Sequence, residues 1–174
     1  YKGIDGHMIP IYFLDTDITE NHEDDRLITL RLYSGDKNHR ILQEAILGFG
    51  GLRFLESLKY YDIKNYHMNE GHCSFLTLEL LRKLKGDRDK VRSLCHFTTH
   101  TPVEAGHDHF SIDRCRKILN NLLPDNLVLP SMIKNKRLHM TELGLNFSRS
   151  ANGVSKLHGE VAQNQFTEFK LDYI

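Results

Sequence analysis

The sequence has no excess of either charge. Lys and Arg together number 23, and Asp and Glu together also number 23, so the formal net charge is 23 − 23 = 0. A nucleic-acid-binding protein needs a basic surface, and a polybasic membrane anchor needs a cluster of Lys and Arg. We therefore expect neither nucleic acid nor a membrane among its partners.

Long apolar runs and paired cysteines are also lacking. No stretch approaches the roughly 20 apolar residues that span a bilayer, and the start shows no charged-then-apolar secretory signal. Cys73, Cys95 and Cys115 are an odd number of cysteines without a Cys-x-x-Cys pair. This usage fits reduced thiols better than a disulfide framework or a zinc ribbon. We therefore expect a cytoplasmic protein.

What is present is ordinary for a globular domain. Of the 174 residues, 40% are apolar and 26% are charged, which argues against wholesale disorder. This length suits one domain, or one domain with an extension. Because the sequence starts at Tyr1 rather than Met, we expect it to be a piece of a longer protein.

Short apolar runs alternate with stretches of helical periodicity along the chain. Met8–Leu14 is rich in β-branched and aromatic residues and predicts a strand that ends in a polar loop. The spacing of Leu76, Leu80 and Leu84 predicts a helix that stops at Gly86. The same criteria predict strands at 8–14, 64–68, 95–98 and 151–154, helices at 36–58, 73–85, 87–94, 112–123, 140–147 and 155–162, and irregular chain at 18–26, 102–112 and 124–137.

This order of elements predicts an α/β fold. Parallel strands need crossover connections, which helices provide, so we expect a parallel sheet covered by helices on both faces. Gly48, Gly50 and Gly51 interrupt the first helical pattern, and each costs about 1 kcal/mol relative to alanine in a helix interior. Either a backbone or a ligand comes close at these glycines, or the helix is simply broken there.

Polar side chains gather where the predicted strands end, and ligands of an open parallel sheet bind beyond the carboxyl ends of its strands. Neighbouring strands lie about 4.8 Å apart. We therefore expect Glu70, His72 and His100 to meet in one cleft. The polar residues at the strand ends are Asp15 and Asp17, then Asn69, Glu70 and His72, then His100, Thr101, His107, Asp108 and His109.

The chemistry of this set suits hydrogen bonding to a polyol. It offers amide, carboxylate, imidazole and hydroxyl groups, with no Ser or Cys in a nucleophile turn and no lysine for a Schiff base. Two alternatives remain. A lone histidine at a strand end is commonly a surface or capping residue. The histidines at 96, 100, 107 and 109 could instead hold the metal of a hydrolase, but their spacing matches no zinc signature, and we expect no metal.

Four longer motifs follow one another along the chain: His-Met-Asn-Glu-Gly-His at 67–72, Phe-Thr-Thr-His-Thr-Pro-Val at 97–103, Ala-Gly-His-Asp at 105–108 and Val-Ser-Lys-Leu-His-Gly-Glu-Val at 154–161. Together they resemble the α-glucan phosphorylase family, most closely its shorter bacterial and archaeal branch. They occur in the family's order and span most of the chain. The resemblance is therefore far more specific than any one motif.

The resemblance implies a fold and an activity. The fold would be a Rossmann-like parallel sheet, part of one half of a two-domain GT-B-type glycosyltransferase. Residues 1–163 would be a partial N-terminal domain, and 164–174 a tail of uncertain status. The activity would be release of glucose 1-phosphate from α-1,4-glucan with inorganic phosphate. Pyridoxal phosphate would be bound by a C-terminal domain that is missing here, so the piece alone would be inactive.

The resemblance also implies roles for individual residues. His100 would contact the glucosyl unit at the scissile bond as the catalytic residue of this segment. Asn69, Glu70 and His72 would line the same pocket, Glu70 would orient the histidines, and Thr101 and Asp108 would shape the adjoining loop. A homo-oligomer is possible. A non-catalytic glucan-binding remnant remains the competing interpretation.

Overall fold

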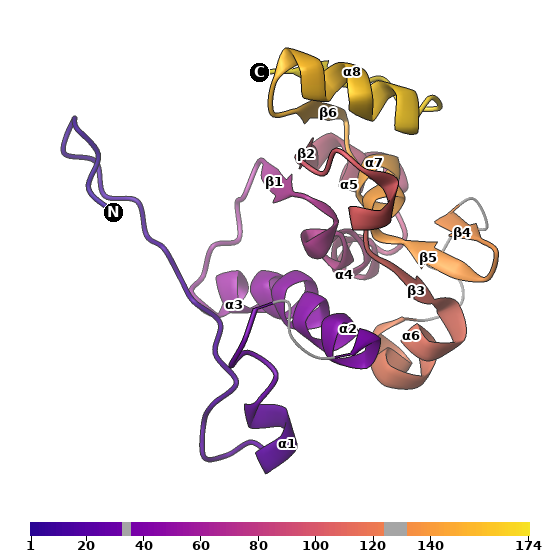
Figure 1. The fold of residues 1–174 in the computed structure, drawn as a ribbon. Helices are drawn as coiled ribbons and strands as arrows, with labels where there is room; N and C mark the ends of the chain where they lie inside the picture. Colours follow the sequence, from indigo (N-terminus) through magenta and orange to yellow (C-terminus); the bar gives the residue numbers. More distant parts are fainter. Residues whose placement is uncertain (33–35, 124–131) are drawn as a thin grey trace.

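The computed structural model describes residues 1–32, 36–123 and 132–174, which form an α/β body with an extended N-terminal arm (Figure 1). The helices are α1 (Glu23–Arg26), α2 (Lys37–Ala45), α3 (Gly51–Ser57), α4 (Phe75–Lys83), α5 (Arg88–Leu94), α6 (Ile112–Leu119), α7 (Met140–Asn146) and α8 (Lys156–Gln165). The strands are β1 (Tyr66–Asn69), β2 (Cys95–Thr99), β3 (His109–Ser111), β4 (Ile133–Lys134), β5 (Arg137–His139), β6 (Ser150–Gly153) and β7 (Asp172–Tyr173).

A four-stranded parallel sheet is the centre of the fold. Its strand order is β1-β2-β6-β7, and Asn69, Thr98 and Asn152 are successive neighbours in register across the first three strands. The parallel sheet and its strands at 64–68, 95–98 and 151–154 are confirmed, with boundaries shifted by one or two residues. Because β1 and β2 are adjacent, the segments that follow them leave the sheet at the same edge.

The helices joining these strands pack on one face of the sheet. A strand order that advances in one direction places right-handed crossovers on the same side. A Cβ added at Gly144 of α7 would lie 2.5 Å from the Phe97 ring, and one added at Gly153 of β6 would lie 2.7 Å from Gly159 N of α8. Phe97 and Gly153 point to the same face, because Phe97 is in register with Ala151, two residues before Gly153.

The opposite face of the sheet is polar. His67 Nε2 lies 2.7 Å from Thr98 Oγ1, His96 Nε2 lies 2.7 Å from Asn152 Oδ1, and the rings of His67 and His96 lie edge to face. His67 is exposed, and α7 and α8, which pack against β2 and β6, lie on the Phe97 face. The sequence predicted helices on both faces of the sheet, but within the described residues this prediction is wrong for the polar face.

The helical segment predicted at 36–58 is confirmed as α2, a π-helix at Ile46–Gly50, and α3. A Cβ at Gly48 would lie 2.6 Å from Phe75 Cβ and 2.7 Å from Leu76 N, so the backbone of α4 comes close at this glycine. Gly50 and Gly51 have no neighbour closer than 3.9 Å at the same test. Close backbone approach thus explains Gly48, and the π-helix supplies the break in α-helical geometry.

The strand predicted at Met8–Leu14 is wrong. Only Met8 forms a bridge, to Lys2, and Phe13 is almost fully exposed in the extended arm of Figure 1. A strand needs a neighbour, and no described strand pairs with this segment. Asp15 and Asp17 therefore do not join the sheet edge: Asp15 accepts hydrogen bonds from Asp17 N and Thr29 Oγ1, and Asp17 pairs with Arg26.

A β-hairpin lies in the region expected to be irregular. Strands β4 and β5 pair through a tight turn at Asn135 and Lys136, both in the left-handed region, and β3 pairs antiparallel with β5. The part of the irregular prediction at 124–131 lies outside the described residues. The predicted helix at 112–123 is α6 followed by a 3₁₀ turn at Asn120–Leu122.

The C-terminal segment is part of the body. Helix α8 runs to Gln165, past the division expected after residue 163, and β7 pairs with β6 in parallel. Leu171 is buried in the core. The division into 1–163 and 164–174 stays a prediction, but the tail adds a strand to the sheet. Among the described residues, no helix has the length and apolar character needed to cross a membrane.

Candidate functional site

A buried carboxylate lies at the carboxyl end of β1. Glu70 follows the last residue of that strand with a φ of 73°, a left-handed conformation that favours glycine, and caps the 3₁₀ turn at Gly71–Cys73. Its residue exposure is 2%. A non-glycine residue held in this conformation needs support from its surroundings, and the side chain of Glu70 supplies that support.

Both oxygens of Glu70 accept hydrogen bonds from the protein. Oε2 accepts from the backbone N–H groups of His100 and Thr101 at 2.9 and 3.1 Å, and from the hydroxyls of Thr99 and Thr101 at 3.0 and 2.9 Å. Oε1 accepts from Gly71 N at 3.1 Å. Burial raises the pKa of Glu70, but these hydrogen bonds outweigh burial and lower its pKa. Glu70 is thus an anion that fixes the chain leaving β2.

The imidazole of His100 projects from this fixed chain. Its side chain is 43% exposed, and its Nδ1 lies 4.0 Å from Glu70 Oε2. Glu70 and His100 therefore lie close together, as predicted, but the carboxylate accepts a hydrogen bond from the backbone N–H of His100 and not from its ring. Asn69 lies exposed beside Glu70 at the end of β1. Asn69, His100 and Thr101 thus share one edge of the sheet.

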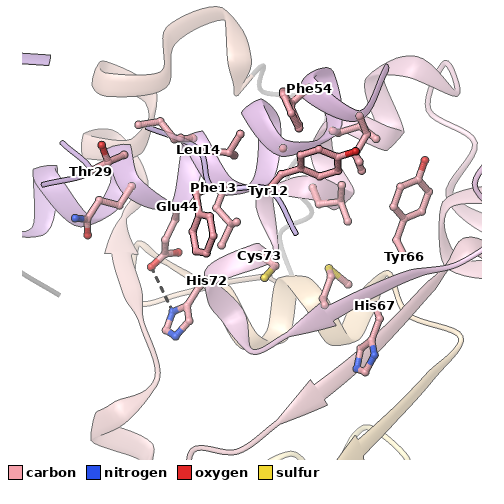
Figure 2. A pocket seen from close by; sticks show the side chains of 18 of the residues that line it. Tyr12, Phe13, Leu14, Thr29, Glu44, Phe54, Tyr66, His67, His72 and Cys73 are labelled. Atoms are coloured by element: carbon pink, nitrogen blue, oxygen red, sulfur yellow. Dashed lines mark ion pairs between the residues drawn. The ribbon is translucent and has the colours of Figure 1, made fainter. Parts of the chain in front are cut away.

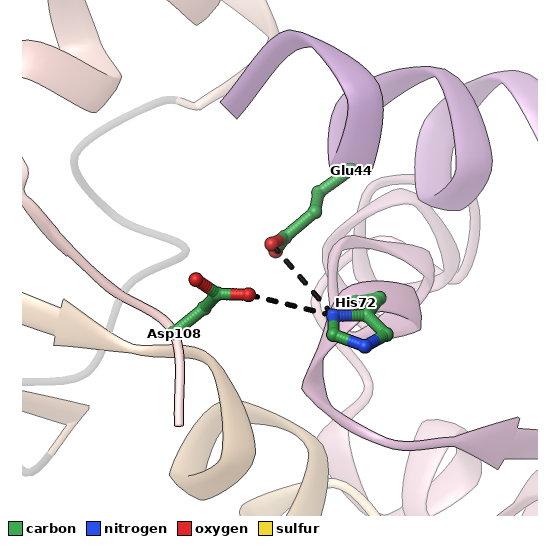
Figure 3. Close-up of side chains that lie close together, drawn as sticks. All are labelled: Glu44, His72 and Asp108. Atoms are coloured by element: carbon green, nitrogen blue, oxygen red, sulfur yellow. Dashed lines mark ion pairs between the residues drawn. The ribbon is translucent and has the colours of Figure 1, made fainter. Parts of the chain in front are cut away.

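A second polar cluster surrounds the guanidinium of Arg40 on α2. Arg40 Nη2 lies 2.5 Å from Asp108 Oδ2, 3.1 Å from Glu44 Oε1 and 3.3 Å from His72 Nδ1. His72 Nδ1 also lies 3.4 Å from Asp108 Oδ2 (Figure 3). The sequence reasoning placed His72 and Asp108 near Glu70 and His100, whereas the structure joins them to Arg40 and Glu44.

The two carboxyl groups of this Arg40 cluster have opposite protonation tendencies. Burial and the neighbouring Asp108 raise the pKa of Glu44 to about 9. Burial also acts to raise the pKa of Asp108, but hydrogen bonds from His72 and Arg40 hold it well below its usual range. At neutral pH the pair therefore carries one proton and one negative charge, which the guanidinium balances.

The Arg40 cluster has the donor set of a metal site but holds an arginine. Among the described residues, Glu44, His72 and Asp108 form the group of potential metal ligands whose donor atoms lie close enough together to bind one ion. A nitrogen of Arg40 lies within 3.3 Å of all three donors and occupies the position of a cation. The histidines considered above for a metal also face separate partners: His96 contacts Ser150 and Asn152, His107 contacts Gln165, and His109 contacts Arg137.

An open cleft of about 810 Å³ adjoins the Arg40 cluster. Its walls are mostly apolar and come from the N-terminal arm, α2, α3 and β1, and Figure 2 shows Glu44 and His72 facing each other beside Phe13. Within the described residues, His72 lines this cleft, whereas Glu70 and His100 do not. The expectation that all three meet in one cleft is therefore wrong for His72.

Arg40 and Glu44 were missed among the site residues. A signal for Glu44 was present, because a carboxylate between the apolar residues Ile41 and Ala45 occupies the buried face of an amphipathic helix. Its partner Asp108 is 64 residues away along the chain, so local periodicity could not identify what neutralises it.

Comparison with known proteins bears on these clusters. Over 92% of its length the chain is 37% identical to a glycogen phosphorylase of Mycobacterium tuberculosis, and over 91% it is 36% identical to a maltodextrin phosphorylase of Thermococcus litoralis. The chain is homologous to one segment of the glucan phosphorylases. A glycogen phosphorylase of Aquifex aeolicus is 33% identical over 94% of the chain. No family model matches the chain.

The shared segment is a small part of each relative. The chain spans 21% of the Mycobacterium glycogen phosphorylase and 20% of the Thermococcus maltodextrin phosphorylase. In the fold, the phosphorylase-like motifs at 67–72, 97–103 and 154–161 fall on β1, on β2 and directly after β6, three adjacent strands. Motifs far apart in the sequence thus lie along one edge of the sheet.

Proposed function

We propose that this chain is a segment of an α-1,4-glucan phosphorylase, which releases glucose 1-phosphate from glucan with inorganic phosphate, and that it supplies part of the glucosyl pocket. Homology to glycogen and maltodextrin phosphorylases over more than nine-tenths of the chain supports the family part of this proposal. The observation that carries the site is the four hydrogen bonds accepted by Glu70 Oε2 from residues 99–101. They hold His100 at the carboxyl end of β2, where ligands of such sheets bind.

In this proposal, His100 is the residue that contacts the glucosyl unit at the scissile bond. Its exposed ring and fixed backbone suit a hydrogen bond to a sugar hydroxyl without reorganisation of the loop. Asn69 and Thr101 line the same pocket from either side. Glu70 acts on the sugar only through the chain that it holds, because its oxygens are occupied by protein donors.

His72 and Asp108 have a less direct part. Their side chains contact Arg40 and each other. In this proposal they bind the outer part of the glucan, or they set the position of η2, the 3₁₀ turn at Gly71–Cys73, and of the loop at 102–108. The side chains of the Arg40 cluster are largely buried, and the guanidinium contacts both carboxylates and the imidazole. It therefore suits a polar wall better than a reacting group.

The proposed activity implies pyridoxal phosphate, whose phosphate group would serve as acid and base toward the substrate phosphate. The described residues do not offer a site for it. No described hydrogen-bonding partner of Glu70 is a lysine, and Lys37 on α2 donates to His109 O at the surface. The resemblance to the phosphorylases supports a cofactor held by a C-terminal domain of the whole protein, and the residues of this segment would bind the sugar only.

The chain's other features agree with an enzyme of the cytoplasm. Its three cysteines are free thiols, and burial raises the pKa of Cys95 and Cys115 to about 12, so neither is a reactive thiolate. We propose a cytoplasmic location, glucan and inorganic phosphate as substrates, and a contact with the C-terminal domain of the same protein.

An activity assay tests this function. The chain is incubated with maltopentaose and phosphate, alone and with a separately produced C-terminal half of a glucan phosphorylase, and glucose 1-phosphate is measured. We expect no product from the chain alone, product from the mixture, and loss of that product with His100→Ala. His7→Ala, on an exposed histidine of the arm, is the matched control.

Three other outcomes would contradict the proposal. Product from the chain alone would show a complete active site in this segment. Saturable binding of maltopentaose with no turnover in the mixture would identify a glucan-binding remnant. Stoichiometric zinc or manganese that is lost on His107→Ala would identify a metal-dependent hydrolase.

A further inference from the structure

The end of α8 is tied to the loop that carries His100. Gln165, the last residue of α8, donates from Nε2 to the carbonyl oxygen of Pro102 at 2.8 Å, and its Oε1 lies 2.8 Å from His107 Nε2. The Pro102 carbonyl can only accept a hydrogen bond, so it fixes which end of the Gln165 amide faces it. The amide oxygen then faces His107, so Nε2 of His107 is the donor in this contact.

The other nitrogen of His107 continues the line toward Glu70. Nδ1 lies 3.0 Å from the Thr141 hydroxyl of α7, and that hydroxyl lies 3.4 Å from Glu70 Oε1. Thr141 is 2% exposed, and the side chain of His107 is 8% exposed. The ring of Phe166 packs edge to face on the imidazole of His107 with centroids 5.1 Å apart. His107 and Thr141 are therefore enclosed by the protein, whereas Gln165 is only partly buried.

Two separate anchors thus hold the four residues from Thr99 to Pro102. Glu70 Oε2 accepts the backbone N–H groups of His100 and Thr101, and Gln165 donates to the carbonyl of Pro102. His107 and Thr141 connect these anchors behind the loop. Loss of the connection would remove the Thr141 contact from Glu70 Oε1, which keeps its hydrogen bond from Gly71 N, and would remove the His107 contact from Gln165 Oε1.

We propose that His107, Thr141 and Gln165 are positioning residues for His100, which act through Glu70 and Pro102. They set the backbone at the carboxyl end of β2 and hence the place where the His100 ring projects. The inference rests on the proposed role of His100 in sugar binding. It also gives the C-terminal end of α8 a part in the site, although that end lies 65 residues from His100 along the chain.

The test measures hydrogen exchange at the backbone amides of His100 and Thr101 by NMR in the 174-residue chain. Thr141→Val removes the hydroxyl and keeps the shape, and we expect exchange at both amides to rise about tenfold, as the loss of one hydrogen bond's support predicts. Thr141→Ser restores the hydroxyl and should restore slow exchange. Thr77→Val is the matched control, because Thr77 is equally buried and bonds only within its own turn at Ser74.

Variants of His107 separate positioning from simple packing. Asparagine can replace the contact of Nδ1 with Thr141, whereas glutamine reaches the position of Nε2 and contacts Gln165. We expect His107→Gln to speed exchange at His100 and Thr101 more than His107→Asn does, because the link to Glu70 runs through Nδ1. The ¹⁵N spectrum of the wild-type ring should show that Nε2 carries a hydrogen-bonded proton.

The outcomes distinguish this inference from the proposed function. Exchange at His100 and Thr101 that stays within twofold of wild type in folded Thr141→Val and His107→Gln would overturn the inference. If Thr141→Val does not fold, Gln165→Leu at the less buried end decides by the same measurement. Faster exchange in these variants with no binding of maltopentaose to the wild type would leave the positioning role standing and refute the sugar site.

Discussion

Replacement of Glu70 perturbs the carboxylate that accepts hydrogen bonds from residues 99–101. In Glu70→Gln, the amide oxygen can take the place of Oε2 and accept the same four hydrogen bonds, but the acceptor is then neutral instead of charged. Bonds to a charged group are worth about 1 kcal/mol more than neutral ones, so the two backbone bonds account for about 2 kcal/mol. The new amide N–H also faces Gly71 N–H, which leaves a buried donor unpaired and adds about 1 kcal/mol.

We therefore expect Glu70→Gln to lower the free energy of unfolding by about 3 kcal/mol, a large part of the 5–15 kcal/mol typical of a domain. Urea unfolding followed by circular dichroism measures the loss, and Glu23→Gln on the exposed α1 is the control. A loss below about 1 kcal/mol would refute the view that this carboxylate anchors the loop.

The pH dependence gives a second check on Glu70. Its pKa is lowered in the folded state, so its ionised form contributes stability above the unfolded pKa of about 4.5. That contribution is lost as pH falls through the folded pKa. The difference in stability between wild type and Glu70→Gln should therefore narrow below about pH 4. A constant difference down to pH 3 would show that the charge of Glu70 is not what the loop requires.

Two further predictions concern α2 and the π-helix. Glu44 has a folded pKa of about 9, so the folded state keeps a proton that the unfolded state releases, and stability falls as pH rises from about 4.5 to 9. Glu44→Gln should remove this pH dependence and raise the free energy of unfolding at pH 8 by about 1–3 kcal/mol, as measured by thermal unfolding. A variant that is no more stabilising at pH 8 than at pH 5 would contradict a protonated Glu44 in the folded state. Gly48→Ala should lower the free energy of unfolding by about 2–3 kcal/mol, because the new methyl group would clash with Phe75 of α4. Gly51→Ala should raise it by up to about 1 kcal/mol, because a Cβ at this position has no neighbour closer than 3.9 Å. Equal effects of the two substitutions would contradict the close approach of α4 to Gly48.

Local patterns were enough to predict the sheet but not its surroundings. The short segments that became β1 and β2 are bounded by polar turns and pair with each other, so alternation and connection length identify them. Met8–Leu14 is more apolar than either strand but has no partner strand in the described chain, and composition alone cannot show that. The hairpin of β4 and β5 was missed because its turn, Asn135-Lys136, lacks the glycine that usually marks two left-handed residues.

The candidate site was predictable to the extent that adjacent parallel strands define it. Glu70 and His100 each follow a strand, and those strands are neighbours, so their proximity follows from topology. Which atoms of the two residues meet does not follow, because the left-handed turn at Glu70 directs its carboxylate at the backbone of the next loop. The attachment of His72 and Asp108 to Arg40 depends on how α2 packs, and the sequence pattern carries no signal for that contact.

Titration of the 174-residue chain with maltopentaose, followed by NMR, is the most direct test of the sugar site. We expect millimolar, saturable shifts at the amides of Asn69, His100 and Thr101, loss of those shifts in His100→Ala, and no loss in His7→Ala. Shifts confined to the apolar cleft at Tyr66 and Met68, or no shifts at all, would contradict a glucosyl pocket at the carboxyl ends of β1 and β2.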